Sequence, residues 1–406
     1  MDVLFLSPAY PPEMQGYVRG LSEVGARVWG VGDTPLQAMS PELRGRLAGY
    51  VQVPRILDAE DVRRRVSEWL GDRRPDRVEA LWEVLVETAA LLRASLEVPG
   101  MSVDTVLGFR DKQVMKQRIA AAGLRVPKAH RVRSVQEVRA AAADVGFPLI
   151  FKPISGAGSA DTYRVDSVER LDAVIQNTRH VREASVEEFV EGREFTYDTL
   201  CIDGQPVFEN VAWYRPRPLI ARQHEWISPV IVTVRHLDQP EIAPGIALGR
   251  GVLKALNMGT GFTHMEWYLT DQGEVVFGEI GCRPGGAHLI DQMNLTCDVD
   301  LFREWARAVC WKDFRGSTTR TYNVAIIFKR AKGEGRIRAV HGVDAFCEKY
   351  RQWVVADRLL PVGAHRRDWT KTLVSDGFLL LRHPDLATAN AMADEAASTI
   401  TMFAGG

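Results

Sequence analysis

Two glutamates, Glu266 and Glu279, lie where a short hairpin would bring them together. Residues 262–269 (FTHMEWYL) and 274–280 (EVVFGEI) flank the turn sequence Asp-Gln-Gly, and this order predicts two antiparallel strands. If the tip lies just before Gly273, the two glutamates face each other. Like charges so paired, with Cβ atoms about 5 Å apart, destabilise a hairpin. A Mg²⁺ ion offsets the repulsion, because it binds carboxylates together with substrate phosphates; two hydrated acids on a solvent face fit the same pattern.

The same register divides the other side chains of the hairpin between its two faces. It places Tyr268 opposite Phe277, on the face of the acids. The other face is expected to be apolar and to form core, through Met265, Trp267, Val276 and Ile280. Arg283 and a glycine pair follow the second strand, so a cation is expected next to the paired acids.

A lysine and a glycine-rich loop follow another predicted strand. Lys152 ends the strand 149–153 (LIFKP) and precedes the loop 155–159 (SGAGS). Glycines let backbone N–H groups approach phosphate oxygens, and a lysine adds a positive charge there. The loop is neither a Walker A motif nor a dinucleotide fingerprint, because no Gly-Lys-Ser/Thr follows and Asp161 replaces the third glycine. Taken alone, it is typical of a plain turn, as Lys112 in DKQVMKQR is typical of a solvated helix face.

The elements that must position these residues begin with an alternating unit. A buried strand at 3–7, a helical stretch and a second strand at 26–32 predict a small doubly wound domain. Apolar spacing predicts further helices over 60–70 and 78–92. We expect this unit to end near residue 107.

Two later regions carry the candidate residues. Asp111 and Ser134 are expected to cap helices over 112–122 and 135–145, ahead of the strand that holds Lys152. The segment 213–226, rich in proline and arginine, is expected to be a loop over a site. Further strands and a last helix are predicted at 184–190, 195–202, 323–328, 377–382 and 385–400.

Composition excludes several classes of function. The chain has 406 residues, 46% hydrophobic and 25% charged, with a net charge of −1, which gives no electrostatic argument for nucleic acid or membrane partners. No apolar run approaches the roughly 18 residues that span a bilayer. The N-terminus lacks the features of a signal peptide, and five scattered cysteines form no C-x-x-C pair. These features favour a cytoplasmic protein with reduced thiols.

Together, the motifs resemble those of the ATP-grasp superfamily over roughly residues 108–291. The branch they resemble most is that of carboxylate–amine ligases of the L-amino-acid ligase (dipeptide synthetase) type, whose signature Glu-Ile-x-x-Arg-x-Gly-Gly matches Glu279 to Gly286. The resemblance implies a mixed α/β fold with a Rossmann-like N-terminal domain, a mobile lid and an antiparallel catalytic domain with a biotin-carboxylase-like tail. The implied domains cover residues 1–107, 108–187 and 188–406.

The resemblance also assigns roles residue by residue. Lys152, Glu279 and Arg283 would be catalytic, with Arg283 facing the substrate carboxylate. Glu266 and Glu279 would hold Mg²⁺, or Mn²⁺. ATP would be bound by Lys112, Lys152, Ser155, Gly156, Gly158, Ser159, Glu187, Glu188, Val190 and Glu194, with Glu187 at the adenine amino group and Glu194 at the ribose. Substrate would be bound by Arg283, Gly285, Gly286, His288, Arg222 and His224. Gln292 is a further candidate. Arg215 and Arg217 could bind an acidic substrate, but they are expected to be solvated surface arginines.

One departure from the family pattern concerns the metal site. Many members carry an asparagine two residues after the second glutamate, as a third ligand, and this chain has Gly281 there. In the predicted register His264 lies opposite Gly281, so His264 or a water molecule would fill the gap. Simple packing of His264 against the sheet is the alternative.

The implied activity is amide-bond formation between an amino acid or related carboxylate and an amine, through an acyl phosphate, with release of ADP and phosphate. The partners would be small molecules, and a homodimer is expected from the superfamily. Two alternatives stay open: a biotin-carboxylase-like enzyme that activates bicarbonate, and a nucleotide sensor without catalysis.

Overall fold

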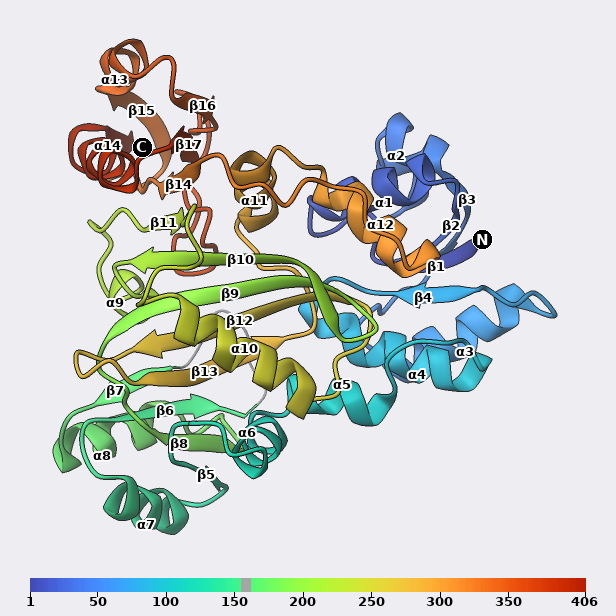
Figure 1. The fold of residues 1–406 in the computed structure, drawn as a ribbon, viewed down its shortest axis with the longest axis horizontal. Coiled ribbons are helices and arrows are strands. Elements are labelled where there is room, and N and C mark those ends of the chain that lie inside the picture. The colour runs from blue at the N-terminus through green and yellow to red at the C-terminus, as the bar shows by residue number, and fades with distance from the viewer. Residues whose placement is uncertain (155–161) are drawn as a thin grey trace.

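The computed structural model describes residues 1–154 and 162–406. The glycine-rich loop predicted at Ser155, Gly156, Gly158 and Ser159 therefore lies outside the described residues. Figure 1 shows three bodies, a blue N-terminal unit, a green unit that we call the lid unit (residues 111–188), and a large sheet that joins them. Among the described residues, no helix has the length and apolar character needed to cross a membrane.

The N-terminal unit is a parallel sheet in the order β3-β2-β1-β4, which confirms the predicted doubly wound arrangement. The predicted helix over 78–92 is wrong in its first part, because Val78 pairs with Leu4 in the sheet and the helix begins only at Val86. The elements of the unit are β1 (Asp2–Leu6), α1 (Met14–Glu23), β2 (Arg27–Gly32), η1 (Leu36–Ala38), α2 (Pro41–Arg46), β3 (Leu47–Gln52), α3 (Ala59–Leu70), β4 (Arg77–Glu79), η2 (Glu83–Leu85) and α4 (Val86–Leu96).

The lid unit is a four-stranded antiparallel sheet in the order β5-β8-β6-β7, and α5 (Val103–Arg110) leads into it. Both predicted helix caps are present: Asp111 accepts from the backbone N–H of Val114, and Ser134 accepts from that of Glu137. Its elements are α6 (Lys112–Ala121), β5 (Ala129–Val132), α7 (Val135–Val145), β6 (Leu149–Pro153), β7 (Tyr163–Val165), α8 (Val168–Asn177) and β8 (Ala184–Glu188).

The large sheet has eight antiparallel strands in the order β13-β12-β9-β10-β11-β14-β17-β16. The segment 213–226 is not simply a loop, since β10 runs to Arg215 and a short helix, α9, follows it. The remaining elements are β9 (Arg193–Ile202), β10 (Gln205–Arg215), α9 (Pro218–Ala221), β11 (Val230–Thr233), α10 (Ala243–Ala255), β12 (Gly261–Leu269), β13 (Val275–Gly281), α11 (Leu289–Cys297), α12 (Leu301–Trp311), β14 (Asn323–Phe328), β15 (Arg336–His341), α13 (Val343–Lys349), β16 (Val354–Asp357), β17 (Phe378–His383), α14 (Leu386–Thr399) and β18 (Thr401–Gly405).

Helix α10 covers one face of this sheet and thereby orients the hairpin β12–β13. Two glycines allow the close approach: a Cβ on Gly245 would lie 2.3 Å from Trp267, and one on Gly249 would lie 2.2 Å from Tyr197. Trp267 and Tyr197 are fully buried in this core. Because alternate side chains of a strand point to opposite faces, residues next to Trp267 point away from α10.

The observed register of the hairpin agrees with the prediction at the acids and differs beyond them. Glu266 pairs with Glu279, but Tyr268 pairs with Val276 rather than Phe277, and Phe277 takes the place in the core expected for Val276. The turn is one residue longer than predicted, and the extra residue Gly278 on β13 offsets it. A Cβ on Gly278 would lie 2.8 Å from the carbonyl oxygen of Glu266, so this bulge requires glycine.

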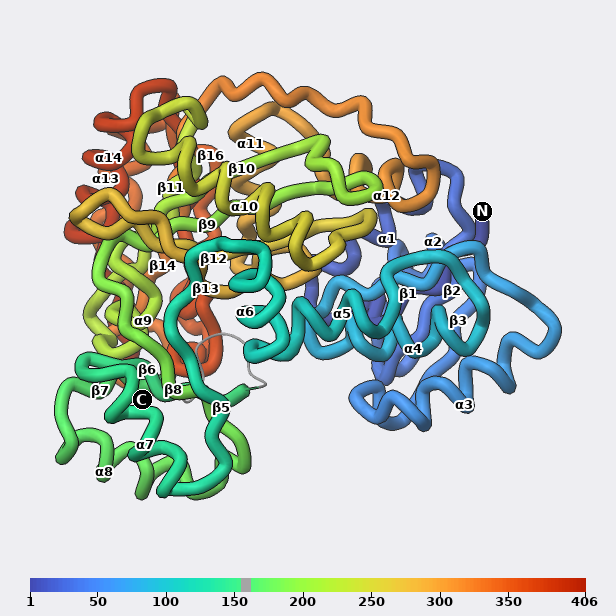
Figure 2. The backbone as a smooth tube through the Cα atoms, turned by 60° about the horizontal axis from the view of Figure 1, so that its bottom comes forward, coloured from blue at the N-terminus to red at the C-terminus, as the bar shows by residue number. Residues whose placement is uncertain are grey.

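The N-terminal unit is fixed to the rest of the chain through α1 and α12. A Cβ on Gly20 would lie 2.3 Å from the carbonyl oxygen of Phe302, so the two helices are in backbone contact. Arg19 pairs with Asp300 at 2.8 Å at the same contact. Figure 2 shows from a second direction that the sheets of the N-terminal unit and the lid unit are separate bodies, with α5 and α6 running between the two sheets.

Candidate active site

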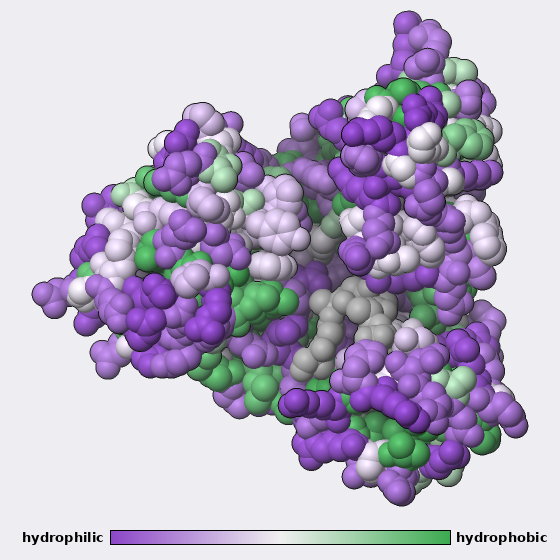
Figure 3. Space-filling view, turned by 180° about the vertical axis from the view of Figure 1, so that it is seen from behind, coloured by the Kyte–Doolittle hydropathy of each residue, from purple (hydrophilic) through white to green (hydrophobic). Residues whose placement is uncertain are grey.

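A cavity of about 360 Å³ lies where the N-terminal unit, the lid unit and the large sheet meet. The face shown in Figure 3 is hollowed between these bodies. Arg222 and His224 are not among the lining residues; the His224 ring lies against Trp226, with centroids 4.4 Å apart. The cavity is lined by twelve of the predicted site residues: Lys112, Lys152, Glu187, Glu188, Val190, Glu194, Glu266, Glu279, Arg283, Gly285, Gly286 and His288.

The paired acids face this cavity. Glu266 and Glu279 lie on the side of the hairpin away from α10, and their side chains are 31% and 36% exposed. Two cavity-facing carboxylates fit Mg²⁺, which would bind them together with waters and substrate phosphates. Within residues 1–154 and 162–406, no group of three His, Cys, Asp or Glu side chains is arranged to hold a metal.

Lysines from the lid unit reach the same cavity. Lys112 Nζ lies 2.8 Å from Glu279, and Lys152 Nζ lies 2.9 Å from Glu187 and 3.9 Å from Glu279. Burial acts to raise the pKa of Glu279, but the two lysines hold it below its usual value. Two elements, α6 and β6, thus gather positive charge next to the acids, an arrangement that suits phosphate binding.

Lys116 is a buried lysine beside the site that was not predicted from the sequence. It pairs with the second carboxylate oxygen of Glu187, and burial lowers the pKa of Lys116 to about 8 despite that partner. Its position four residues after Lys112, on the same face of α6, was the available signal. Glu187 is held by two lysines, so it orients Lys152 as well as facing the cavity.

Arg217 is also not the solvated arginine that was expected. Its Nε lies 3.0 Å from Glu194, its Nη1 donates to the carbonyl of Val190 at 2.8 Å, and its guanidinium lies 4.7 Å from the ring centre of Tyr268. Burial and the charge of Glu266 raise the pKa of Glu194 to about 7, against the effect of Arg217.

This shift of Glu194 gives a pH prediction. Its pKa rises from 4.5 on folding, so its contribution to stability is complete below pH 4.5 and is lost as the pH rises through 7. In urea unfolding, Glu194→Gln should therefore gain about 1 kcal/mol relative to the wild type between pH 6 and pH 8. The exposed control Glu334→Gln should show no such trend, and parallel pH profiles for Glu194→Gln and the wild type would contradict the assignment.

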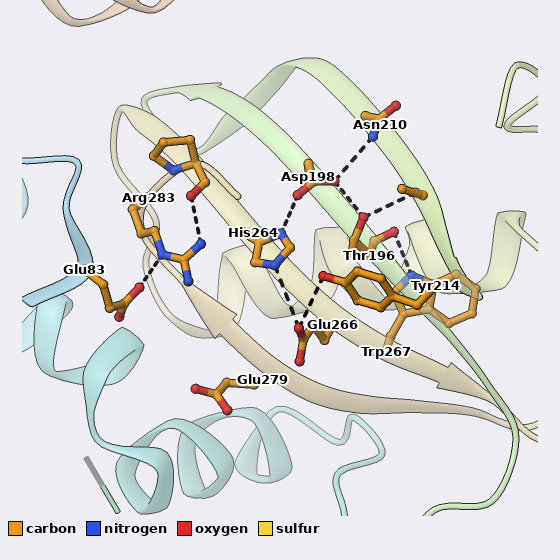
Figure 4. A network of polar contacts seen from close by, with 12 residues as sticks. Glu83, Thr196, Asp198, Asn210, Tyr214, His264, Glu266, Trp267, Glu279 and Arg283 are labelled. Carbon is orange, nitrogen blue, oxygen red and sulfur yellow. Dashed lines mark hydrogen bonds and ion pairs between the residues drawn. The ribbon is translucent and has the colours of Figure 1, made fainter. Parts of the chain in front are cut away.

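A polar network anchors His264, which lies beside Glu266 (Figure 4). His264 Nδ1 lies 2.6 Å from buried Asp198, which also accepts from Thr196 at 2.7 Å and from Asn210 at 3.3 Å. The other ring nitrogen, Nε2, lies 3.9 Å from Glu266. His264 is thus fixed to the sheet, with Nε2 directed toward the acid.

Arg283 lies at the opposite side of the acids from the lid unit. Its Nε donates to Glu83 and its Nη1 to the carbonyl of Pro284 at 2.8 Å. Glu83 also pairs with Arg110, and despite burial the two arginines hold the pKa of Glu83 below its usual value. No sequence signal pointed to Glu83, because its contact with Arg283 joins residues 200 positions apart.

His288 and Gln292, which both follow the glycine pair in sequence, have different surroundings. His288 lines the cavity, where its Nδ1 lies 2.7 Å from Asp291 and its ring lies against Phe378. Gln292 is buried and donates to the carbonyls of Ile231 and Val324, so its suggested role in the substrate pocket is wrong.

Comparison with known proteins shows which families the chain is similar to. The family model for the carbamoyl-phosphate synthase L chain, ATP binding domain, matches residues 111–194. Over 245 residues the chain is 25% identical to the L-arginine-specific L-amino acid ligase of Bacillus subtilis, covering 59% of this chain and 58% of that protein. The two first curated relatives are matched over only 58% and 54% of their length.

Solved structures show the same fold over nearly the whole chain. The L-amino acid ligase of Bacillus licheniformis superposes with a TM-score of 0.79 at 19% identity, covering 100% of this chain and 99% of that one. The biotin carboxylase domain of the Hydrogenobacter thermophilus 2-oxoglutarate carboxylase, crystallised with MgADP and bicarbonate, gives 0.71 at 14% identity over 99% and 90%. Residues 111–194 thus carry an ATP-grasp family domain, and the chain has a mixed α/β fold. The chain is similar to L-amino acid ligases both in sequence and in fold.

Proposed function

We propose that the protein is an ATP-dependent carboxylate–amine ligase that joins an amino acid to an amine. One observation carries the proposal: a pair of facing acids, the lysines of the lid unit and an oriented arginine converge on one cavity. Lys112 and Lys152 would hold ATP phosphates, and Glu266 and Glu279 would hold Mg²⁺, which spreads the phosphate charge. The similarity to L-amino acid ligases supports the same conclusion.

In the proposed reaction, positioning and charge neutralisation do most of the work. Arg283 would hold a substrate carboxylate oxygen in line with the γ-phosphorus. Transfer of the phosphoryl group gives an acyl phosphate and ADP. An amine then attacks the acyl carbon, phosphate leaves, and Arg283 stabilises the oxyanion that forms. Water would have to be kept from the acyl phosphate, because water hydrolyses it.

The N-terminal unit supplies an apolar wall to this cavity through Met14, Tyr17, Leu81 and Trp82. Such a wall suits an acyl substrate with an apolar side chain, because its burial is favourable by about 25 cal/mol per Å². Ala287 also lines the cavity and is small, which leaves room for a larger substrate.

The deciding experiment is ADP release with a panel of amino acids, singly and in pairs, with product masses read by mass spectrometry. We expect ADP and phosphate when a carboxylate and an amine are both present, and a product whose mass is their sum less one water. Hydroxylamine should trap the acyl phosphate as a hydroxamate. Release of ADP with bicarbonate alone would contradict the proposal in favour of a carboxylase type, and no release with any substrate would favour a nucleotide sensor.

A further inference from the structure

Glu83 brings the N-terminal unit into direct contact with Arg283 (Figure 4). One carboxylate oxygen accepts from Arg283 Nε and the other from Arg110 Nη1 in α5. The side chains of Glu83 and Arg283 are 13% and 21% exposed, and both line the cavity. This largely buried pair joins two bodies of the molecule at the proposed reaction centre.

The glycine at position 281 provides the space for this contact. A Cβ there would lie 3.1 Å from the nearer oxygen of Glu83 and 3.6 Å from Arg283 Cγ. Any side chain at 281 would press on the carboxylate, because 3.1 Å is shorter than an ordinary van der Waals contact. Gly281 is therefore explained by packing against Glu83.

Two hydrogen bonds fix the plane of the guanidinium. Arg283 Nε is held by Glu83 and Nη1 by the carbonyl of Pro284. Nη2 has no protein partner within residues 1–154 and 162–406, and it belongs to a side chain that lines the cavity. Without Glu83, the guanidinium would be drawn to the nearby charge of Glu266, which already acts on it.

We propose that Glu83 is a positioning residue for Arg283: it orients the guanidinium so that Nη2 meets the substrate carboxylate, and Gly281 leaves the room it needs. The inference rests on the proposed ligase function for its kinetic consequence. The contact itself is independent of that function.

The first test compares Glu83→Gln with the matched control Glu87→Gln. Glu87 also approaches Arg110, at 3.4 Å, but it is 55% exposed and has no contact with Arg283. In Glu83→Gln, kcat/KM for the carboxylate substrate should fall on the order of 100-fold, as small misplacements of a reacting group do. Its Kd for ADP, and all constants of Glu87→Gln, should stay within about twofold of wild type.

A double-mutant cycle tests whether Glu83 acts through Arg283. If it does, adding Glu83→Gln to Arg283→Lys should change kcat/KM by less than about twofold, because the interaction is already lost. Gly281→Ala, which keeps both charges, should lower kcat/KM in the same direction as Glu83→Gln. If Glu83→Gln and Arg283→Lys lowered kcat/KM independently, so that their effects on its logarithm added in the double variant, the proposal would be overturned.

Arginine-selective ¹⁵N NMR gives a readout that does not depend on turnover. The Nε–H signal of Arg283, assigned by its loss in Arg283→Lys, should exchange slowly in the wild type and in Glu87→Gln, and rapidly in Glu83→Gln. Equal exchange in all three would overturn the contact. If the signal behaved as expected while the wild type released no ADP with any substrate pair, the ligase function would fail and the contact would stand.

Discussion

Arg283→Lys should lower kcat for amide formation by about 10²–10³-fold, the range for removal of one donor to a developing oxyanion. Lysine keeps the charge but has neither a planar fork nor an Nε–H for Glu83. It therefore cannot hold a carboxylate in the same orientation. The measurement is single-turnover formation of ADP from ATP with saturating amino acids.

The same variant should bind nucleotide normally. The predicted phosphate ligands Lys112 and Lys152 come from the lid unit and contact Glu279 and Glu187 rather than Arg283. The Kd for MgADP by calorimetry should thus match that of the wild type. Arg27→Lys, at an exposed ion pair with Asp2, is the control and should leave both quantities unchanged. Full activity in Arg283→Lys would rule out its role at the substrate carboxylate.

Replacing either paired acid by glutamine should abolish most of the metal-dependent activity. Mutation of a residue that only hydrogen-bonds to a metal ligand already lowers metal affinity or activity about 10–100-fold. Mutation of a direct ligand should lower them at least as much. The readout is Mn²⁺ binding in the presence of ADP, followed by electron paramagnetic resonance, together with the Mg²⁺ dependence of turnover.

The two variants should differ in their binding of ADP without metal. Glu279 faces Lys112 and Lys152, so Glu279→Gln removes a negative charge that competes with phosphate and should bind metal-free ADP more tightly. Glu266 has no lysine within ion-pair distance among the described residues, so Glu266→Gln should tighten metal-free binding less than Glu279→Gln does. Glu274→Gln, at the turn of the same hairpin, is the control. Normal Mg²⁺ dependence in both variants would disprove the metal site.

Local signals predicted most of the elements that carry the site. The caps at Asp111 and Ser134 set the starts of α6 and α7 because their side-chain bonds involve residues two or three positions away. The facing pair Glu266 and Glu279 was also found locally, from a turn and an alternation of side chains. The register beyond the pair was wrong, because nothing nearby in the sequence shows that Gly278 must fit against the carbonyl of Glu266.

The side chains that orient the site could not be predicted in this way. Arg217 and Lys116 resemble surface cations in sequence, and only the fold buries them against Glu194 and Glu187. Gln292 is the reverse case. A polar residue near the glycine pair was predicted to line the substrate pocket, but its side-chain amide donates to two backbone carbonyls inside the core. Contacts of this kind depend on how separate units meet, which motif spacing does not record.

The hairpin also sets a rule for altering its connection. The loop is one residue longer than predicted, and β13 carries one extra residue at Gly278. The two irregularities compensate each other in the register, so Glu266 lies opposite Glu279; either one alone in this sequence would leave the acids out of register. Removing a single residue from one of the two strands between the loop and Gly278 would slide that strand past the other and turn Glu279 toward α10. Removing one residue from each strand would shorten the hairpin and keep both carboxylates in the cavity. The length of the hairpin can therefore be changed only by matched deletions in the two strands.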